Sequence, residues 1–199
     1  MLAGHDQASD SPGLGADPGD VERALFARIR EGDLRAFEAL YRSYRPRLMR
    51  FLLGLVRRRP LAEEALDDTM MVIWQRPDTY KGDSKLSTWI FAIAYRKALQ
   101  ALRRRHEPVE DKDAETRESP DAGPEQQAGQ HRVQEALLSA ISELSPDHRA
   151  VVDLTYFHEI GYREIAEIMD CPVDTVKTRM FHARRHLKRI LAGELADWL

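Results

Sequence analysis

Residues 164–189 read EIAEIMDCPVDTVKTRMFHARRHLKR, and they concentrate positive charge in one part of the chain. The stretch begins with acidic and apolar residues, is interrupted by Cys171-Pro172, and contains no carboxylate after Asp174. The basic residues that follow are Lys177, Arg179, Arg184, Arg185, Lys188 and Arg189. Because the whole chain has a net charge of −3, attraction to a polyanion requires this kind of segregation.

Residues 173–191 form two opposite faces when they are placed on a helix at about 100° per residue. One face is apolar: Val173, Val176, Met180, Ala183, Leu187, Ile190 and Leu191. The other carries Lys177, Thr178, Phe181, His182, Arg185 and Lys188, with Arg184 at its margin. We expect the apolar face to pack on the preceding helix, which leaves the basic face exposed.

A short helix, a tight turn at 170–172 and a second helix with a basic outer face are typical of a helix-turn-helix. In that motif the second helix enters the major groove, where lysine donates to guanine and an aromatic ring contacts the thymine methyl group. Lys177, Thr178 and Phe181 have this chemistry, while Arg179, Arg184 and Arg185 are better placed for phosphates. The alternative interpretation is a solvated basic face on an ordinary helical hairpin.

The composition is that of a globular protein, with 43% hydrophobic and 32% charged residues. The longest apolar run, residues 89–95, is far shorter than the roughly 18 residues that span a bilayer. Residues 1–20 lack the features of a secretory signal, and the lone Cys171 allows no intrachain disulfide. We therefore expect a cytoplasmic protein that inserts into no membrane.

Two segments rich in polar residues and proline divide the chain. Residues 1–20 read as a disordered tail, and residues 107–130 carry eight acidic and two basic residues. Between them the apolar residues recur at helical spacing, so we predict an all-α fold of two small bundles on a flexible linker. The expected division is tail 1–20, first helical domain 21–107, linker 108–130 and helix-turn-helix domain 131–199. The expected helices are 21–31, 34–56, 61–75, 85–105, 131–143, 147–157, 162–169 and 173–191.

Local signals support several of these boundaries. Asp33 is a suitable N-cap, and Pro60 followed by Glu63 and Glu64 favours a helix start. Pro46 lies inside the second helical pattern, where we expect it to begin a new segment or a kink.

The sequence offers no constellation for catalysis. His182 and His186 share a helical face like a metal pair, but no third ligand is evident from the sequence. We interpret Cys171, at the turn, as a small buried hydrophobic residue. With no glycine-rich phosphate loop and no nucleophile-base pair, we expect neither a metal, nor a cofactor, nor enzyme activity.

The segment from Leu144 to Leu187, LSPDHRAVVDLTYFHEIGYREIAEIMDCPVDTVKTRMFHARRHL, resembles region 4 of bacterial sigma factors of the extracytoplasmic-function (ECF) class. The stretches AEEALDDTMMVIWQ (62–75), YKGDSKLSTWIFAIA (80–94) and LRRR (102–105) resemble region 2 of the same family. Both occur in the family's order, and the resemblance covers residues 21–192. It implies a protein that binds core RNA polymerase and directs it to promoters.

The resemblance also implies roles for individual residues. Those expected at the upstream (−35) element are Thr175, Lys177, Thr178, Arg179, Phe181, His182, Arg184, Arg185, Arg149 and Arg163. Those expected at the melted (−10) element are Tyr80, Lys81, Asp83, Ser84, Lys85 and Arg96. Those expected against the polymerase clamp are Glu63, Glu64, Asp67, Asp68 and Met71. The resemblance also implies a further partner, an anti-sigma factor that holds both domains.

Three positions depart from the family pattern. Arg96 stands where the family often has Asn, Gln100 where it often has Asp, and Asp67 where it often has Gln. An arginine at 96 replaces an amide that both donates and accepts with a cation that only donates. The −10 sequence of relatives therefore does not transfer to this chain.

Other interpretations of the same residues stay open from the sequence alone. The YKGDS loop could be a simple turn with Tyr80 packed on the bundle. The acidic linker could lie on the basic helix 177–189. The whole chain could be a stand-alone helix-turn-helix regulator with a helical effector domain, or an adaptor that binds only protein.

Overall fold

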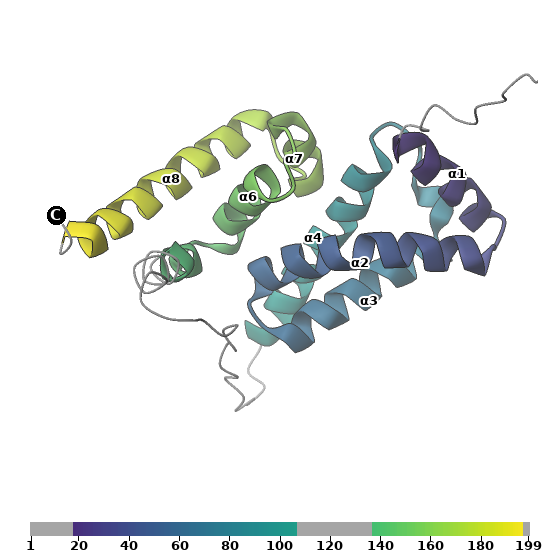
Figure 1. Cartoon of the computed structure of the whole chain (residues 1–199), viewed down its shortest axis with the longest axis horizontal. Helices are drawn as coiled ribbons and strands as arrows, with labels where there is room; N and C mark the ends of the chain where they lie inside the picture. The colour runs from purple at the N-terminus through teal and green to yellow at the C-terminus, as the bar shows by residue number, and fades with distance from the viewer. Residues whose placement is uncertain (1–17, 107–136, 197–199) are drawn as a thin grey trace, which may run out of the picture.

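The computed structural model describes the backbone of residues 18–106 and 137–196, and side chains within 19–104 and 137–192. Every regular element in these two ranges is helical, which confirms the predicted all-α class (Figure 1). The predicted tail (1–17 of it) and the acidic linker lie outside the described residues. The N-terminal bundle comprises α1–α4, and the C-terminal bundle comprises α6–α8 with a preceding helical turn at 137–143.

Helices α1 (Pro18–Arg30) and α2 (Leu34–Val56) are joined by a tight turn. Gly32 adopts φ 83°, a left-handed conformation that glycine takes without strain. The carboxylate of Asp33 then accepts from the backbone N–H groups of Arg35 (2.9 Å) and Ala36 (3.1 Å), which confirms the predicted N-cap. Arg28 also donates to Asp33, and this hydrogen bond lowers the pKa of the Asp33 carboxyl.

Pro46 does not begin a new segment, because α2 runs unbroken through it. Proline removes one donor from the helix, leaving the carbonyl of Arg42 without its usual partner. Arg42 and Pro46 are both exposed, so water can satisfy that carbonyl. At this solvent-facing position Pro46 therefore begins no new segment, and the expected kink stays a prediction.

The N-terminal bundle is completed by α3 (Arg59–Gln75), the short η1 (Pro77–Thr79) and α4 (Leu86–His106). Pro60 lies in the first turn of α3, as expected. The bundle interior is apolar, and Phe51 packs edge-on against Phe91 with ring centroids 5.4 Å apart. Its fully buried side chains are Ile29, Leu40, Tyr44, Leu48, Phe51, Leu52, Leu55, Leu66, Ile73, Ile90 and Phe91.

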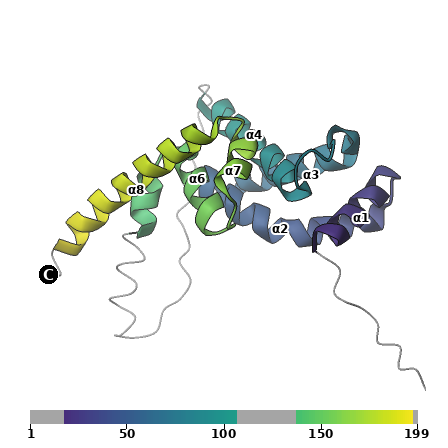
Figure 2. The same ribbon diagram turned by 90° about the horizontal axis from the view of Figure 1, so that it is seen from above.

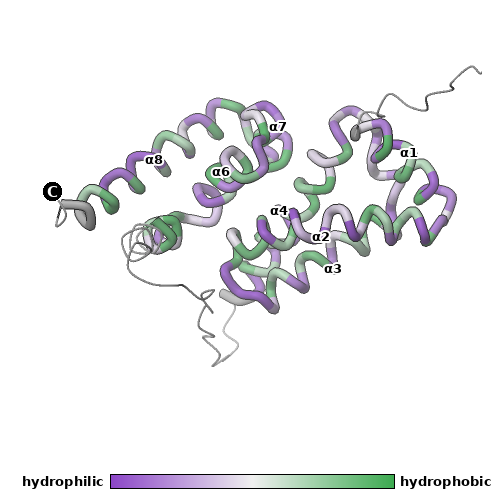
Figure 3. Tube along the Cα trace, in the orientation of Figure 1, coloured by the Kyte–Doolittle hydropathy of each residue, from purple (hydrophilic) through white to green (hydrophobic). Residues whose placement is uncertain are grey.

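The C-terminal bundle contains α6 (Pro146–Tyr156), α7 (Tyr162–Met169) and α8 (Val173–Ala196). Ser145 caps α6, and α7 ends at Asp170, whose φ of 49° turns the chain sharply before Pro172. Figure 3 shows alternating hydrophilic and hydrophobic stretches along α8, as expected for a helix with one buried side. This is the predicted helix-turn-helix arrangement.

The two bundles pack directly against each other, a feature that the sequence did not predict. Helix α7 lies against α4, and α6 lies against the C-terminal part of α2 (Figures 1 and 2). A Cβ atom added to Gly54 of α2 would meet the Asp153 carboxylate of α6 at 3.4 Å. The small residue at 54 therefore allows a close approach between the bundles.

None of the helices in the described ranges is long and apolar enough to span a bilayer.

Candidate nucleic-acid interface

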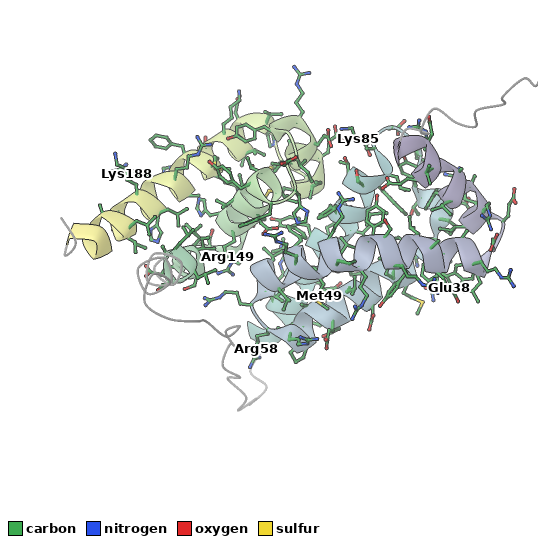
Figure 4. All side chains as sticks on the ribbon, in the orientation of Figure 1. Glu38, Met49, Arg58, Lys85, Arg149 and Lys188 are labelled. Atoms are coloured by element: carbon green, nitrogen blue, oxygen red, sulfur yellow. The ribbon has the colours of Figure 1, made fainter. Side chains whose placement is uncertain are left out.

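Helix α8 buries one side and exposes the other, as the helical wheel predicts. Val176, Met180 and Ala183 are at most 2% exposed and pack into the C-terminal bundle. The opposite side carries the exposed residues Lys177, Thr178, Phe181, His182, Arg184 and Arg185, which we call the reading face. Figure 4 shows Lys188, one turn further on, pointing away from the bundle.

The polar residues at the start of the reading face make only local contacts. Lys177 Nζ lies 2.9 Å from the Asp174 carboxylate, and the Thr178 hydroxyl donates to the Asp174 carbonyl at 2.9 Å. The Phe181 ring is 62% exposed beside His182, an unusual position for a large apolar side chain in a folded bundle. These side chains can reach a groove without any rearrangement of the helix.

Arg184 is oriented by an aromatic residue that sequence reasoning missed. Its Nε donates to the Tyr156 hydroxyl at 3.0 Å, and its guanidinium lies 5.7 Å from the centre of the Tyr156 ring. Tyr156 ends α6 and is 55% exposed. No periodic signal marks it, because its partner comes from a different helix.

The other arginines and the threonine expected at the −35 element have different environments. Arg163 is exposed at the start of α7 and borders a shallow groove with Cys171 and Pro172, whereas Thr175 is half-buried. Arg179 is turned inward, with its guanidinium 2.5 Å from the Asp147 carboxylate and 3.6 Å from Cys171 Sγ. Cys171 is half-buried and lines this groove, so it is not the fully buried residue that was expected, although its partial burial raises the pKa of the thiol.

Arg149 is held between the bundles. Its guanidinium donates to the carbonyls of Leu144 (2.9 Å) and Ser142 (3.2 Å) and, across the bundle boundary, to that of Leu55 (2.9 Å). Figure 4 shows Arg149 between α6 and the end of α2. In this conformation its charge faces backbone carbonyls rather than the reading face, so the expected phosphate contact stays a prediction.

Histidines gather beside the reading face. The rings of His148 and His182 have centroids 6.4 Å apart, and His186 Nε2 lies 3.6 Å from the Glu143 carboxylate. Burial, followed by the charges of His182 and Arg179, lowers the pKa of His148. Among the side chains that the structure describes, no group of three or more is arranged to hold a metal ion.

The loop expected at the −10 element is anchored by its aromatic residue. The Tyr80 ring packs against Phe26 and Trp89, with centroids 5.2 and 5.3 Å away. Its hydroxyl donates to the Ser84 carbonyl at 2.7 Å, and Gly82 turns the backbone at φ 85°. The ring of Tyr80 is therefore half-buried in the bundle, although the sequence-based hypothesis made it a stacking platform.

The remaining residues of this loop and of α4 differ in their partners. Lys81, Asp83 and Arg96 are exposed, and Ser84 is half-buried. Lys85 Nζ lies 2.6 Å from the Glu164 carboxylate of α7, and this hydrogen bond raises the pKa of Lys85. Figure 4 shows Lys85 at the start of α4, beside α7.

Helix α3 presents the acidic residues expected against polymerase. Glu63 pairs with Arg59 at 2.9 Å, and Glu64 pairs with Arg104 of α4 at 2.9 Å. Asp68 lies 3.1 Å from Lys97 Nζ, also on α4.

The outer side of α3 combines a charge with an apolar side chain. Asp67 is exposed, and Met71 is 52% exposed. These two residues form an accessible surface, whereas the neighbouring acids are bridged to basic partners.

Two family models match the chain in the order of the two bundles. Residues 40–107 match Sigma-70 region 2, and residues 134–187 match Sigma-70, region 4. The chain is 29% identical over 178 residues to the ECF RNA polymerase sigma-E factor of Haemophilus influenzae, covering 84% of this chain and 94% of that protein. It is 28% identical to the RNA polymerase sigma-H factor of Pseudomonas aeruginosa, covering 89% and 97%.

Solved structures show the same architecture. RpoE of Bartonella quintana, a sigma factor solved with the anti-sigma factor NepR, matches with a TM-score of 0.60 at 28% identity, over 79% of this chain and 98% of that one. CnrH, solved with the cytosolic domain of CnrY, shares the fold with a TM-score of 0.63 at 22% identity, over 87% and 99%. The chain belongs to the sigma-70 family of RNA polymerase sigma factors, in its extracytoplasmic-function class.

Proposed function

We propose that this sigma factor directs core RNA polymerase to promoters by reading the −35 element with α8 and holding the melted −10 strand with the N-terminal bundle. The observation that carries this proposal is the exposed reading face, on the second helix of a helix-turn-helix, in a chain that matches both promoter-binding regions. Its work is binding rather than catalysis, in the cytoplasm where polymerase and promoters are found.

At the −35 element, the first exposed turns of α8 contact base edges. Lys177 donates to guanine O6 or N7, Thr178 bonds either a donor or an acceptor, and Phe181 contacts a thymine methyl group. Arg184, fixed by Tyr156, contacts phosphate and fixes the position of the helix without reading sequence. We propose that Arg163, Arg185 and Thr175 add contacts to the DNA backbone.

At the −10 element, the cations of the loop and of α4 attract the opened strand. Lys81 and Lys85 flank the Gly82 turn, and Arg96 is exposed nearly three turns into α4. A cationic surface of this kind tracks the backbone of single-stranded DNA. We propose that Tyr80 positions this loop through its hydroxyl bond to Ser84, while Asp83 and Ser84 line the site of an extruded base.

On the polymerase side, α3 docks through its exposed Asp67 and Met71. An exposed methionine adapts to an irregular partner surface, and the adjacent carboxylate favours a basic one. Glu63, Glu64 and Asp68 shape the negative potential of this helix through their bridges to Arg59, Arg104 and Lys97. Docking holds both DNA-binding bundles on one surface, so that binding of the second becomes intramolecular.

We propose that an anti-sigma protein controls this sigma factor. RpoE of Bartonella quintana was solved with the anti-sigma factor NepR, and it shares the architecture of this chain. An anti-sigma partner that covers α3 or the reading face would prevent promoter recognition.

Transcription in vitro tests the proposal directly. Purified core polymerase with the wild-type chain is expected to initiate at a promoter selected from its own genome, and core polymerase alone is not. The isolated chain is expected to bind the same duplex weakly at physiological salt. Tight, selective binding without polymerase would instead favour a stand-alone regulator.

A further inference from the structure

The two bundles are joined by polar contacts centred on residues assigned to DNA. One oxygen of the Glu164 carboxylate of α7 accepts a hydrogen bond from Lys85 Nζ at 2.6 Å, and the other accepts one from the Thr88 hydroxyl at 3.2 Å. Thr88 lies in the first turn of α4 and is 2% exposed. The Glu164 side chain, which belongs to the helix-turn-helix, therefore covers the start of α4, the helix that follows the −10 loop.

A second carboxylate joins three helices. The Tyr95 hydroxyl of α4 donates to Asp147 Oδ1 of α6 at 2.7 Å, and Arg179 of α8 lies 2.5 Å from Asp147 Oδ2. Tyr95 is 4% exposed, and its burial, together with the hydrogen bond to Asp147, raises its pKa. The phenol is therefore a fixed donor across the boundary between the bundles.

An arginine of each bundle also donates a hydrogen bond to a backbone carbonyl of the other bundle. Arg149 reaches Leu55 O at 2.9 Å, and Arg57 reaches Ser142 O at 3.0 Å. The His158 ring, whose side chain is 4% exposed, also lies at this boundary, with its centroid 4.9 Å from that of the Phe91 ring of α4. Polar and apolar contacts thus extend over the whole boundary, which we call the inter-bundle interface.

We infer that the inter-bundle interface is a closed state of the free protein, in which Glu164 occupies the place of a melted-strand phosphate at Lys85. This inference rests on the proposed role of Lys85 at the −10 element. Carboxylate and phosphate offer the same negative oxygens to an ammonium group, so the two compete for it. Holding of the −10 strand then requires α7 to leave α4.

In the closed state, the surfaces for the two promoter elements differ in how accessible they are to DNA. The reading face of α8 is exposed on the side of the C-terminal bundle away from α4, whereas Lys85 is engaged. Duplex recognition at the −35 element is therefore available in the closed form, and strand capture is not. The Lys85 side chain is 71% exposed and that of Glu164 is 30% exposed, and an ion pair this accessible shifts an equilibrium only by several-fold, so a DNA phosphate can compete with it.

Distance measurements on the full chain test the closed state. Spin labels at Ser43→Cys on α2 and Ala192→Cys on α8, in a Cys171→Ser background, are both at exposed positions. The wild-type interface predicts one narrow distance distribution. The double variant Glu164→Gln, Tyr95→Phe removes the ion pair of Glu164 and the hydrogen bond of Asp147 to Tyr95, and it predicts a second, separate population. A broad distribution without these substitutions would overturn the inference.

Binding of a single-stranded oligonucleotide tests the competition. Glu164→Gln is expected to raise the affinity of the free chain for the non-template −10 strand by roughly threefold to tenfold, since a surface ion pair no longer opposes it. Glu167→Gln is the matched control, because Glu167 is exposed on the same helix and makes no ion pair with Lys85. Equal gains for both variants would refute the competition.

The two readouts separate this inference from the proposed function. If the labels report the closed state but core polymerase and the chain fail to initiate at any promoter, the sigma-factor assignment fails and the closed state stands. If transcription succeeds and the free chain is open, the closed state fails and the assignment stands.

Discussion

The reading face of α8 and the loop at residues 80–85 were both expected to bind DNA, yet they differ in what already occupies them. Lys177 and Thr178 contact only Asp174, their own neighbour in the helix. Tyr80 is packed between Phe26 and Trp89, and Lys85 is paired with a residue from the other bundle. The first surface is accessible, whereas the second is already in contact with other parts of the protein.

The largest expected effect comes from comparing a substitution on the buried side of α8 with one on its exposed side. Met180→Asp would place an unpaired charge where the side chain is 2% exposed, and should destabilise the C-terminal bundle by at least about 4 kcal/mol. Phe181→Asp, one residue on, should change the free energy of unfolding by less than about 0.5 kcal/mol. Urea titration followed by circular dichroism measures both, and comparable losses would contradict the orientation of α8.

The next effect tests whether the ring of Tyr80, unlike that of Phe181, is held inside its bundle. Tyr80→Ala removes a ring from the Phe26–Trp89 cluster and should cost about 2–4 kcal/mol of stability in the N-terminal bundle. Tyr80→Phe keeps the ring and loses only the hydroxyl bond to Ser84, so it should cost about 1 kcal/mol. Thermal unfolding compares them. A harmless Tyr80→Ala would mean that the ring is free to stack on a base.

The third prediction separates base reading from phosphate contact within the reading face. Lys177→Ala should cost about 1–3 kcal/mol at particular −35 base pairs, and little on promoters already mutated there. Arg184→Ala should weaken all promoters similarly and reduce the dependence of binding on salt. Affinities of the polymerase complex for a panel of promoters at several salt concentrations provide the test. Identical profiles for the two variants would contradict the assignment.

The smallest expected effect concerns pH. Burial lowers the pKa of His148 below its ordinary value of 6.5 in the folded state, so the unfolded chain binds more protons there. Stability should therefore decline as the pH falls below about 6.5, toward the folded-state pKa. The other titratable and charged groups that act on His148 are His182, Arg179, Asp147 and His186. Subtracting the pH profile of His148→Asn from that of the wild-type chain isolates this contribution, which should be absent from the variant.

What the sequence could predict depended on local patterns. The limits of α7, the cap at Asp33 and the two sides of α8 follow from spacing and side-chain chemistry within one helix. Pro46 begins no new segment because the effect of proline depends on whether its helix face meets water. Tyr80 looked like a free aromatic because its partners, Phe26 and Trp89, come from distant positions.

The contacts between the bundles were not predictable in the same way. Arg149 and Lys85 look like DNA contacts in the sequence, and nothing nearby reveals that Leu55 and Glu164 lie opposite them. Such pairs depend on how two separately folded units meet across a long linker. No periodicity within either unit encodes that geometry.

One selection experiment tests the central claim, that the exposed side of α8 reads the −35 element. Core polymerase carrying the wild-type chain or Lys177→Ala transcribes a promoter library randomised over the −35 element, and the transcribed promoters are sequenced. The account predicts that the wild-type chain enriches defined bases and that the variant loses preference at one or two adjacent positions only. Unchanged preferences in the variant would contradict it.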